Sequence, residues 1–233
     1  MKPIEETQQV LDDLATYGDE GTLAQLSEMS DLIRQIVPEC VGLSVCMVDT
    51  GITFTLVATD EEIAALDAVQ YLDGGPCLDA VETRQIITAP AGDALALDED
   101  IWLMHAQATA AVGIRSTMSI PLNEDDEVVG GINLYASTPH AFDEQVEVLA
   151  RALGSSAAEA VRNADLTFGT REQARLGPTH LDEYDQVNRA VGALVHARGI
   201  ESGSARKVLR DAAARAGLSE GQVARAVLGL LAD

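Results

Sequence analysis

Apolar side chains recur every three or four residues in two stretches of the first 168 residues. Such spacing places them along one face of an α-helix. The pattern predicts a helix over residues 22–37, ended by Pro38, and a longer helix over residues 143–168 that runs out of its domain. The apolar positions are Leu23, Leu26, Met29, Ile33, Ile36 and Val37 in the first stretch, and Val146, Leu149, Leu153, Ala157, Ala160, Val161 and Ala164 in the second.

Runs rich in β-branched and apolar residues lie between these two helical stretches. They occur as two pairs, and a short polar turn separates the members of each pair. That arrangement is typical of β-hairpins and therefore predicts antiparallel strand pairing. The runs are residues 41–48 and 52–57 around the turn 49–51, and residues 116–122 and 128–135 around the turn 123–127.

The last 53 residues, 181–233, repeat the helical spacing in three short segments. They predict a small three-helix bundle whose isolated stability would be marginal, so docking or dimerisation is expected to support it. The apolar stripes are Leu181, Tyr184, Val187, Val191, Leu194 and Val195; Ala205, Val208, Leu209, Ala212, Ala213 and Ala216; and Val223, Ala226, Val227, Leu230 and Leu231. The expected caps are Gly199 and Gly217 at helix C-termini, Ser202 opening the second helix, and Ser219 with Gln222 as a capping box opening the third.

Charge divides the chain near the same place. The 233 residues carry a formal net charge of −23, and residues 1–180 hold 8 basic and 31 acidic side chains, whereas residues 181–233 hold 7 of each. An acidic surface repels nucleic acid and anionic lipid, so any nucleic-acid binding must fall to the C-terminal segment. We divide the chain into an acidic N-terminal extension (1–21), an α+β domain (22–168), a linker (169–180) ending near Pro178, and a three-helix domain (181–233).

The sequence lacks the motifs that are typical of several function classes. It shows neither a run of about 18 apolar residues nor a signal peptide, which predicts a cytoplasmic chain without membrane contact. The four histidines have no metal-binding spacing, and no Ser-His-Asp, P-loop or paired-carboxylate motif is legible. We therefore expect no metal site and no enzyme. Cys40, Cys46 and Cys77 are expected to be reduced structural thiols.

Three segments follow the order and spacing of a known sensor domain. They are residues 69–80 (VQYLDGGPCLDA), residues 113–122 (GIRSTMSIPL) and residues 130–136 (GGINLYA), followed by Phe142. Over about residues 22–165 the chain resembles the GAF domain of actinobacterial regulators. The resemblance implies a central antiparallel sheet with helices and a small-molecule pocket on one sheet face, but the sequence names no ligand or cofactor. The candidate pocket residues are Tyr71, Cys77, Trp102, Asn133 and Tyr135.

Cys77 has two interpretations. In the first, the preceding Gly74-Gly75-Pro76 forms a turn and Cys77 is a small apolar residue at the start of a short helix. In the second, the helix N-terminus activates Cys77 as a redox sensor. Because no lysine, arginine or histidine lies near it in sequence, we expect the structural role.

The C-terminal segment resembles the ANTAR domain, a three-helix module that binds paired RNA stem-loops in bacterial antiterminators. The matching residues are Ala190 to Val195 in the first helix, Ala205, Val208, Leu209, Arg210 and Ala212 in the second, and Leu218, Val223 and Ala224 at the third. The chain departs from the family pattern at Val191, at Val195 and at residues 217–220. The candidate RNA-binding residues are Arg189, Arg198, Arg206, Lys207 and Arg210, with Arg215 and Arg225 as further basic positions.

Three functions follow from these features. In the first, a GAF homodimer, formed through the helices at 22–37 and 143–168, responds to a signal and controls C-terminal domains that bind stem-loop RNA in antitermination. In the second, the C-terminal bundle binds a protein partner, as its neutral charge allows. In the third, the domain is an enzyme like the GAF-like domains that reduce free methionine sulfoxide with cysteines. The three cysteines of this chain do not match the cysteine pattern of those enzymes.

Overall fold

A five-stranded antiparallel sheet forms the centre of the computed structural model, which describes residues 20–90, 102–124, 127–163 and 181–230. The strand order is β2-β1-β5-β4-β3. Both predicted hairpins are confirmed, since β1 pairs with β2 and β4 with β5. The strand β3, which the sequence pattern does not predict, adds to the edge of β4. The strands are β1 (Cys40–Asp49), β2 (Ile52–Ala58), β3 (Ile87–Pro90), β4 (Ser116–Glu124) and β5 (Glu127–Ala136).

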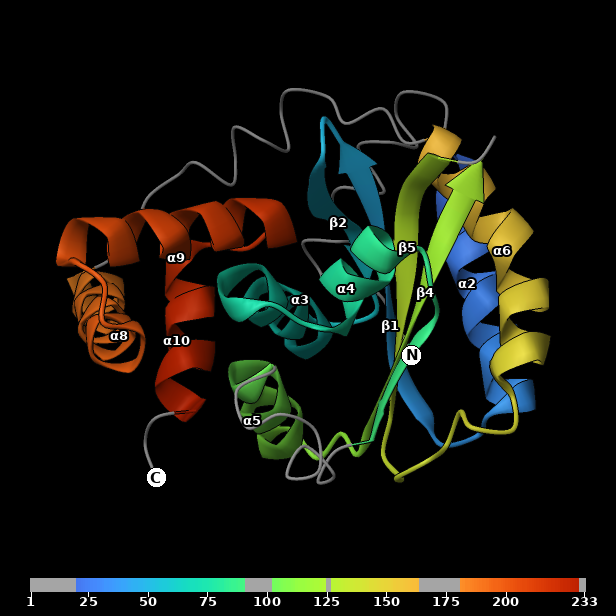
Figure 1. The fold of residues 1–233 in the computed structure, drawn as a ribbon, viewed down its shortest axis with the longest axis horizontal. Helices are drawn as coiled ribbons and strands as arrows, with labels where there is room; N and C mark the ends of the chain where they lie inside the picture. The colour runs from blue at the N-terminus through green and yellow to red at the C-terminus, as the bar shows by residue number, and fades with distance from the viewer. Residues whose placement is uncertain (1–19, 91–101, 125–126, 164–180, 231–233) are drawn as a thin grey trace.

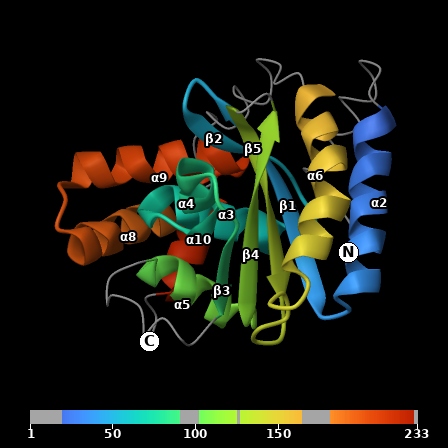
Figure 2. The same cartoon turned by 45° about the vertical axis from the view of Figure 1, so that its right-hand side comes forward.

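Two long helices cover one face of this sheet, as Figures 1 and 2 show. They are α2 (Glu20–Ile36) and α6 (Val146–Asn163), which pack against each other and confirm the two helices expected from the apolar spacing. Ile33, Leu149 and Leu153 are fully buried against the sheet residues of one apolar cluster. The remainder of the expected second helix, residues 164–168, lies outside the described residues, as do most of the N-terminal extension and the whole linker.

Three shorter helices lie on the opposite side. They are α3 (Glu61–Asp73), α4 (Pro76–Thr83) and α5 (Leu103–Ala111). The helices α3 and α4 pack on the sheet, and α5 packs on α3. The helix α3 begins where the Asp60 carboxylate accepts a hydrogen bond from the Ile63 amide at 2.8 Å, and it ends at Gly74, whose φ of 93° suits glycine. The helix α4 begins with Pro76 at its first position, so Cys77 lies in a first helical turn as expected.

The C-terminal segment forms the three expected helices α8 (Leu181–Arg198), α9 (Ser202–Ala216) and α10 (Glu220–Leu230). Gly199 and Gly217 both have the left-handed φ expected of C-cap glycines, at 63° and 68°. The Ser219–Gln222 capping box is also confirmed, with reciprocal hydrogen bonds of 2.7 and 3.2 Å. Our assignment of Ser202 as a cap is wrong: Glu201 is the cap residue, without a side-chain hydrogen bond, and Ser202 is already helical.

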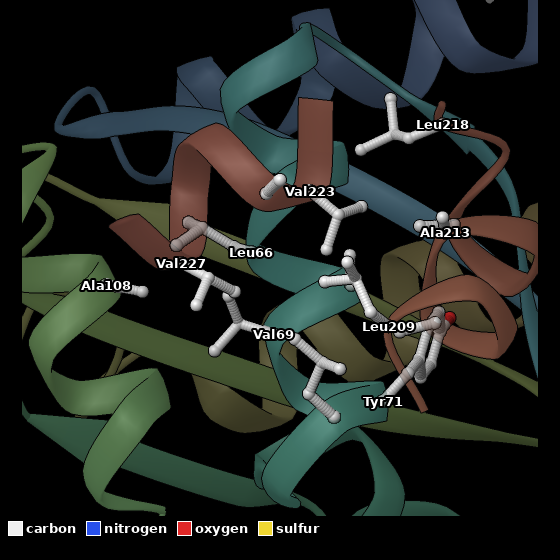
Figure 3. Packing of buried hydrophobic residues seen from close by; sticks show 14 of the residues in the cluster. Leu66, Val69, Tyr71, Ala108, Leu209, Ala213, Leu218, Val223 and Val227 are labelled. Carbon is white, nitrogen blue, oxygen red and sulfur yellow. The ribbon is translucent and has the colours of Figure 1, made fainter. Parts of the chain in front are cut away.

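This bundle docks on the first domain. The helices α9 and α10 pack on α3, α10 also contacts α5, and the bundle lies on the side of the sheet opposite α2 and α6 (Figure 1). Leu66 and Val69 of α3 and Ala108 of α5 join Val223 and Val227 of α10 in one buried apolar cluster, seen in Figure 3. The expected docking is therefore present. Among the described residues no helix is long and apolar enough to cross a bilayer.

Candidate sensor site

A fully buried carboxylate lies between the sheet and α3. Asp67 accepts hydrogen bonds from the Tyr135 hydroxyl at 2.9 Å, the Asn133 amide at 3.1 Å and the Thr55 hydroxyl at 2.9 Å. Gln70 donates to the Tyr135 oxygen at 3.2 Å. These residues, with Tyr71, form what we call the Asp67 cluster.

Burial governs the charge state of this cluster. Desolvation raises the pKa of Asp67 above its ordinary value, and the surrounding hydrogen bonds to Thr55, Tyr135 and Asn133 oppose that rise. Burial also raises the pKa of Tyr71 and Tyr135 well above the ordinary value, and the charge of Asp67 adds to both shifts. The two phenols therefore remain protonated donors at neutral pH.

The cluster continues to α4 through Gln70. Its side-chain oxygen accepts a hydrogen bond from the Cys77 amide at 2.8 Å, which fixes the start of α4 against α3. The Cys77 sulfur lies 3.3 Å from that of Cys46, and both cysteines are buried. Sequence reasoning missed this approach because the two cysteines stand 31 residues apart on different elements.

An arginine of the C-terminal bundle reaches the edge of the same cluster. The Arg215 guanidinium lies 4.0 Å from the ring centroid of Tyr71, a cation–π distance, and its Nε donates to the Thr53 carbonyl at 2.9 Å. Tyr71 in turn shares a 2.9 Å hydrogen bond with Thr55, which donates to Asp67. A continuous path of contacts thus joins the buried carboxylate to α9.

Comparison with protein families identifies this first domain. The sequence model of the GAF domain matches residues 24–162, more than half of the chain. The chain belongs to the GAF domain family. A search of curated proteins finds no match.

The solved structures that the chain resembles include free methionine-R-sulfoxide reductases and a sensor-kinase GAF domain. The type II reductase from Thermoplasma acidophilum is 14% identical, with 61% of this chain and 94% of that chain covered and a TM-score of 0.43. The GAF domain of a two-component sensor histidine kinase from Bacillus halodurans is 16% identical, with 58% and 92% covered and a TM-score of 0.40. A Staphylococcus aureus reductase with its substrate is 15% identical, with 69% and 98% covered and a TM-score of 0.41.

Four of the five candidate pocket residues of the GAF domain lie together. Tyr71, Asn133 and Tyr135 belong to the Asp67 cluster, and Cys77 joins it through Gln70. Trp102 stands apart: it precedes α5, is half-buried, and approaches Gly74 and the Asp79 carboxylate at the α3–α4 junction. The described residues include no group of three His, Cys, Asp or Glu side chains suited to a metal ion.

The candidate RNA-binding residues are spread over two surfaces. Arg206 lies 3.9 Å and Arg210 3.1 Å from the carboxylate of Glu220, a residue that is only 3% exposed. Arg198 turns to the GAF domain, where it contacts the Leu72 carbonyl and lies 3.3 Å from the Asp73 carboxylate.

Arg189 and Lys207 are exposed on α8 and α9, and neither has a charged partner among the described residues within 4.0 Å. Two further arginines hold the bundle in place: Arg215 contacts Tyr71, and Arg225 lies 3.6 Å from Glu61. The polar side of α9 is thus less basic than its sequence predicts.

Buried His105 on α5 makes the stability of the folded chain depend on pH. Its side chain is buried, neither ring nitrogen has a hydrogen-bond partner among the described residues, and burial lowers its pKa from 6.5 to about 4. The unfolded chain therefore binds this proton near pH 6.5, whereas the folded chain binds it only near pH 4. We expect stability to fall as the pH drops from 6.5 towards 4, by about 3 kcal/mol from this group alone.

Urea unfolding at several pH values, on the parent and on His105→Leu, measures this contribution. The difference in unfolding free energy between the two proteins isolates it, because Asp67, whose raised pKa acts in the opposite direction, is common to both. A difference that stays constant across this pH range would contradict the expectation.

Proposed function

We propose that this chain is a signal-responsive regulator in which the GAF domain controls a C-terminal domain that binds stem-loop RNA in transcription antitermination. The observation that supports it is the double role of α3. This helix carries Asp67, Gln70 and Tyr71 of the candidate sensor site, and it is also the surface on which α9 and α10 pack. A change at the site therefore acts directly on the helices that would contact RNA.

Homodimerisation through α2 and α6 belongs to the same proposal. These helices lie on the face opposite the docked bundle, and Leu32 and Val148 present exposed apolar side chains there, at 36% and 49% exposure. Sedimentation over micromolar concentrations tests this assembly. A monomer at every concentration would refute it.

Exposed cations offer the cleanest test of RNA binding. The double variant Arg189→Ala/Lys207→Ala removes about two phosphate contacts, which should reduce the slope of log affinity against log salt by about 1.4–1.8. Stability should change by no more than about 0.5 kcal/mol, because both side chains are exposed. Arg206 and Arg210 are left in place, since removing them would leave buried Glu220 without its ion pairs.

Binding is measured with a tandem stem-loop RNA at several salt concentrations. Arg115→Ala is the matched control, because Arg115 is an exposed arginine outside α2, α6 and the bundle. The control should keep the parent slope. Failure of the parent protein to bind such RNAs with any salt dependence would refute the RNA function.

A protein partner for the bundle is the second candidate. The ion pairs of Glu220 with Arg206 and Arg210 favour it, because they neutralise two cations of the surface that would face phosphate. Association through an apolar helix face would be nearly independent of salt, which separates it from RNA binding in the same titration.

A further inference from the structure

Two thiols meet at the centre of the GAF domain. The 3.3 Å between Cys46 Sγ on strand β1 and Cys77 Sγ in the first turn of α4 exceeds a disulfide bond by only about 1.2 Å. Gly131 on the neighbouring strand β5 leaves room for this approach, since a Cβ there would lie 3.2 Å from Cys46 Sγ. The third cysteine, Cys40, is occupied elsewhere and donates to the Gly42 carbonyl at 3.4 Å.

We propose that Cys46 and Cys77 form a reversible disulfide and that hydroperoxides are the oxidants the GAF domain detects through it. The Cys77 sulfur first attacks the terminal oxygen of the hydroperoxide ROOH, so that an S–O bond forms and the O–O bond breaks. The thiol proton of Cys77 passes to the leaving oxygen, and Cys77 sulfenic acid and ROH result. The Cys46 sulfur then attacks the sulfenic sulfur, the S–O bond breaks, and the hydroxyl leaves as water with the Cys46 proton. The two thiols together lose two electrons, and one hydroperoxide accepts them.

The positions of the two cysteines in the fold indicate which one attacks the hydroperoxide and which one then attacks the sulfenic acid. Cys77, for which the sequence favours a structural role, lies in the first turn of an eight-residue helix, and the neighbouring Leu78 and Asp79 are half-buried. Local opening of so short a helix admits a molecule as small as hydrogen peroxide. Cys46 lies within a central strand, and its hydrogen bond with Cys77, together with burial, raises its pKa well above the ordinary value. It is therefore protonated at rest, and its proton passes to the leaving hydroxyl as the sulfur attacks the sulfenic acid of Cys77.

Disulfide formation would reach the docked bundle. Drawing Cys77 towards β1 pulls on its 2.8 Å hydrogen bond to Gln70, and the next residue of α3 is Tyr71, on which Arg215 rests at 4.0 Å. The transmission from the disulfide to the bundle rests on the proposed function and names hydroperoxides as its signal. Its tests use no RNA, so their outcome is independent of whether the bundle binds RNA.

The first experiment treats the folded full-length chain with hydrogen peroxide, alkylates free thiols and maps the peptides by mass spectrometry. We expect a cross-linked Cys46–Cys77 peptide that dithiothreitol reverses and that persists in Cys40→Ala but is absent in Cys77→Ala. The mapping on the unsubstituted chain needs no variant to fold. Three alkylated cysteines, or sulfinic acid on Cys77 without the cross-link, would overturn the site.

The second experiment compares amide hydrogen exchange of oxidised and reduced protein. Exchange in α3 and α9 should differ at least several-fold between the two states of the parent and of Cys40→Ala, and should be unchanged by peroxide in Cys77→Ala. A cross-link that forms without changing exchange in α9 would refute the signalling role while leaving the disulfide.

Discussion

Replacing Asp67 by alanine is expected to lower the free energy of unfolding by about 3 kcal/mol at pH 7, because at least two buried donors would lose their acceptor. Tyr135 and Asn133 both donate to Asp67 Oδ1, at 2.9 and 3.1 Å. Thr55 is less affected, since its hydroxyl also bonds to Tyr71 at 2.9 Å. The loss should appear as a lower urea midpoint with an unchanged slope.

Asp67→Asn is the matched variant. Its amide oxygen can accept from Tyr135 and Asn133, and its NH2 group can donate to the Thr55 oxygen, so stability at pH 7 should stay within about 1 kcal/mol of the parent. The raised pKa of Asp67 adds a pH signature, because its stabilising contribution is present at acid pH and is lost as the pH rises through the folded-state pKa. The free energy of unfolding of the asparagine variant should therefore rise relative to that of the parent as the pH rises from about 4. Equal losses in both variants would show that the hydrogen bonds of Asp67 do not stabilise the fold.

Gly130→Ala is expected to cost about 3 kcal/mol or to prevent folding, because its Cβ meets backbone that has no room to move. That Cβ would lie 2.2 Å from the Cys46 carbonyl oxygen, in the pairing of strands β1 and β5 at the middle of the sheet. Thermal unfolding monitored by circular dichroism measures the loss.

Gly192→Ala provides the control for this substitution. Gly192 is exposed in the middle of α8, with no atom within 4 Å of the added Cβ, so alanine should stabilise the protein by about 0.5–1 kcal/mol. A Gly130 variant as stable as the parent would mean that β1 and β5 separate without cost.

Elements with one exposed face were predictable from the sequence. The spacing of Met29 and Ile33 in α2 arises because solvent and core lie on opposite sides of that helix. The two hairpins were predicted instead from β-rich runs around polar turns, since helices cover both faces of the sheet and the strands are buried in long continuous runs. The helix α3 gives no such pattern: the sheet covers one side of it and the bundle the other, so nine of its residues are buried. The strand β3 is only four residues long and ends at Pro90, which leaves too little pattern to detect.

Most of the site depends on contacts that local sequence does not encode. Four pocket residues were found because they fall in the segments that resemble GAF domains. Asp67 was missed, since a carboxylate within an apolar helix has no sequence signature until its hydrogen-bond donors are known. The Arg215–Thr53 contact joins positions 162 residues apart, and the docking of the bundle produces it.

The shared apolar cluster between α3 and the bundle also has a thermodynamic consequence. Two segments that differ in composition and charge become one cooperative folding unit, because neither can expose its side of the cluster without exposing the other. Linkage then acts on the whole chain: a ligand that binds only the folded GAF domain stabilises α8, α9 and α10 by the same RT ln(1 + [L]/Kd) as the domain it occupies. Binding of such a ligand to the GAF domain would therefore also raise the melting temperature of the three C-terminal helices.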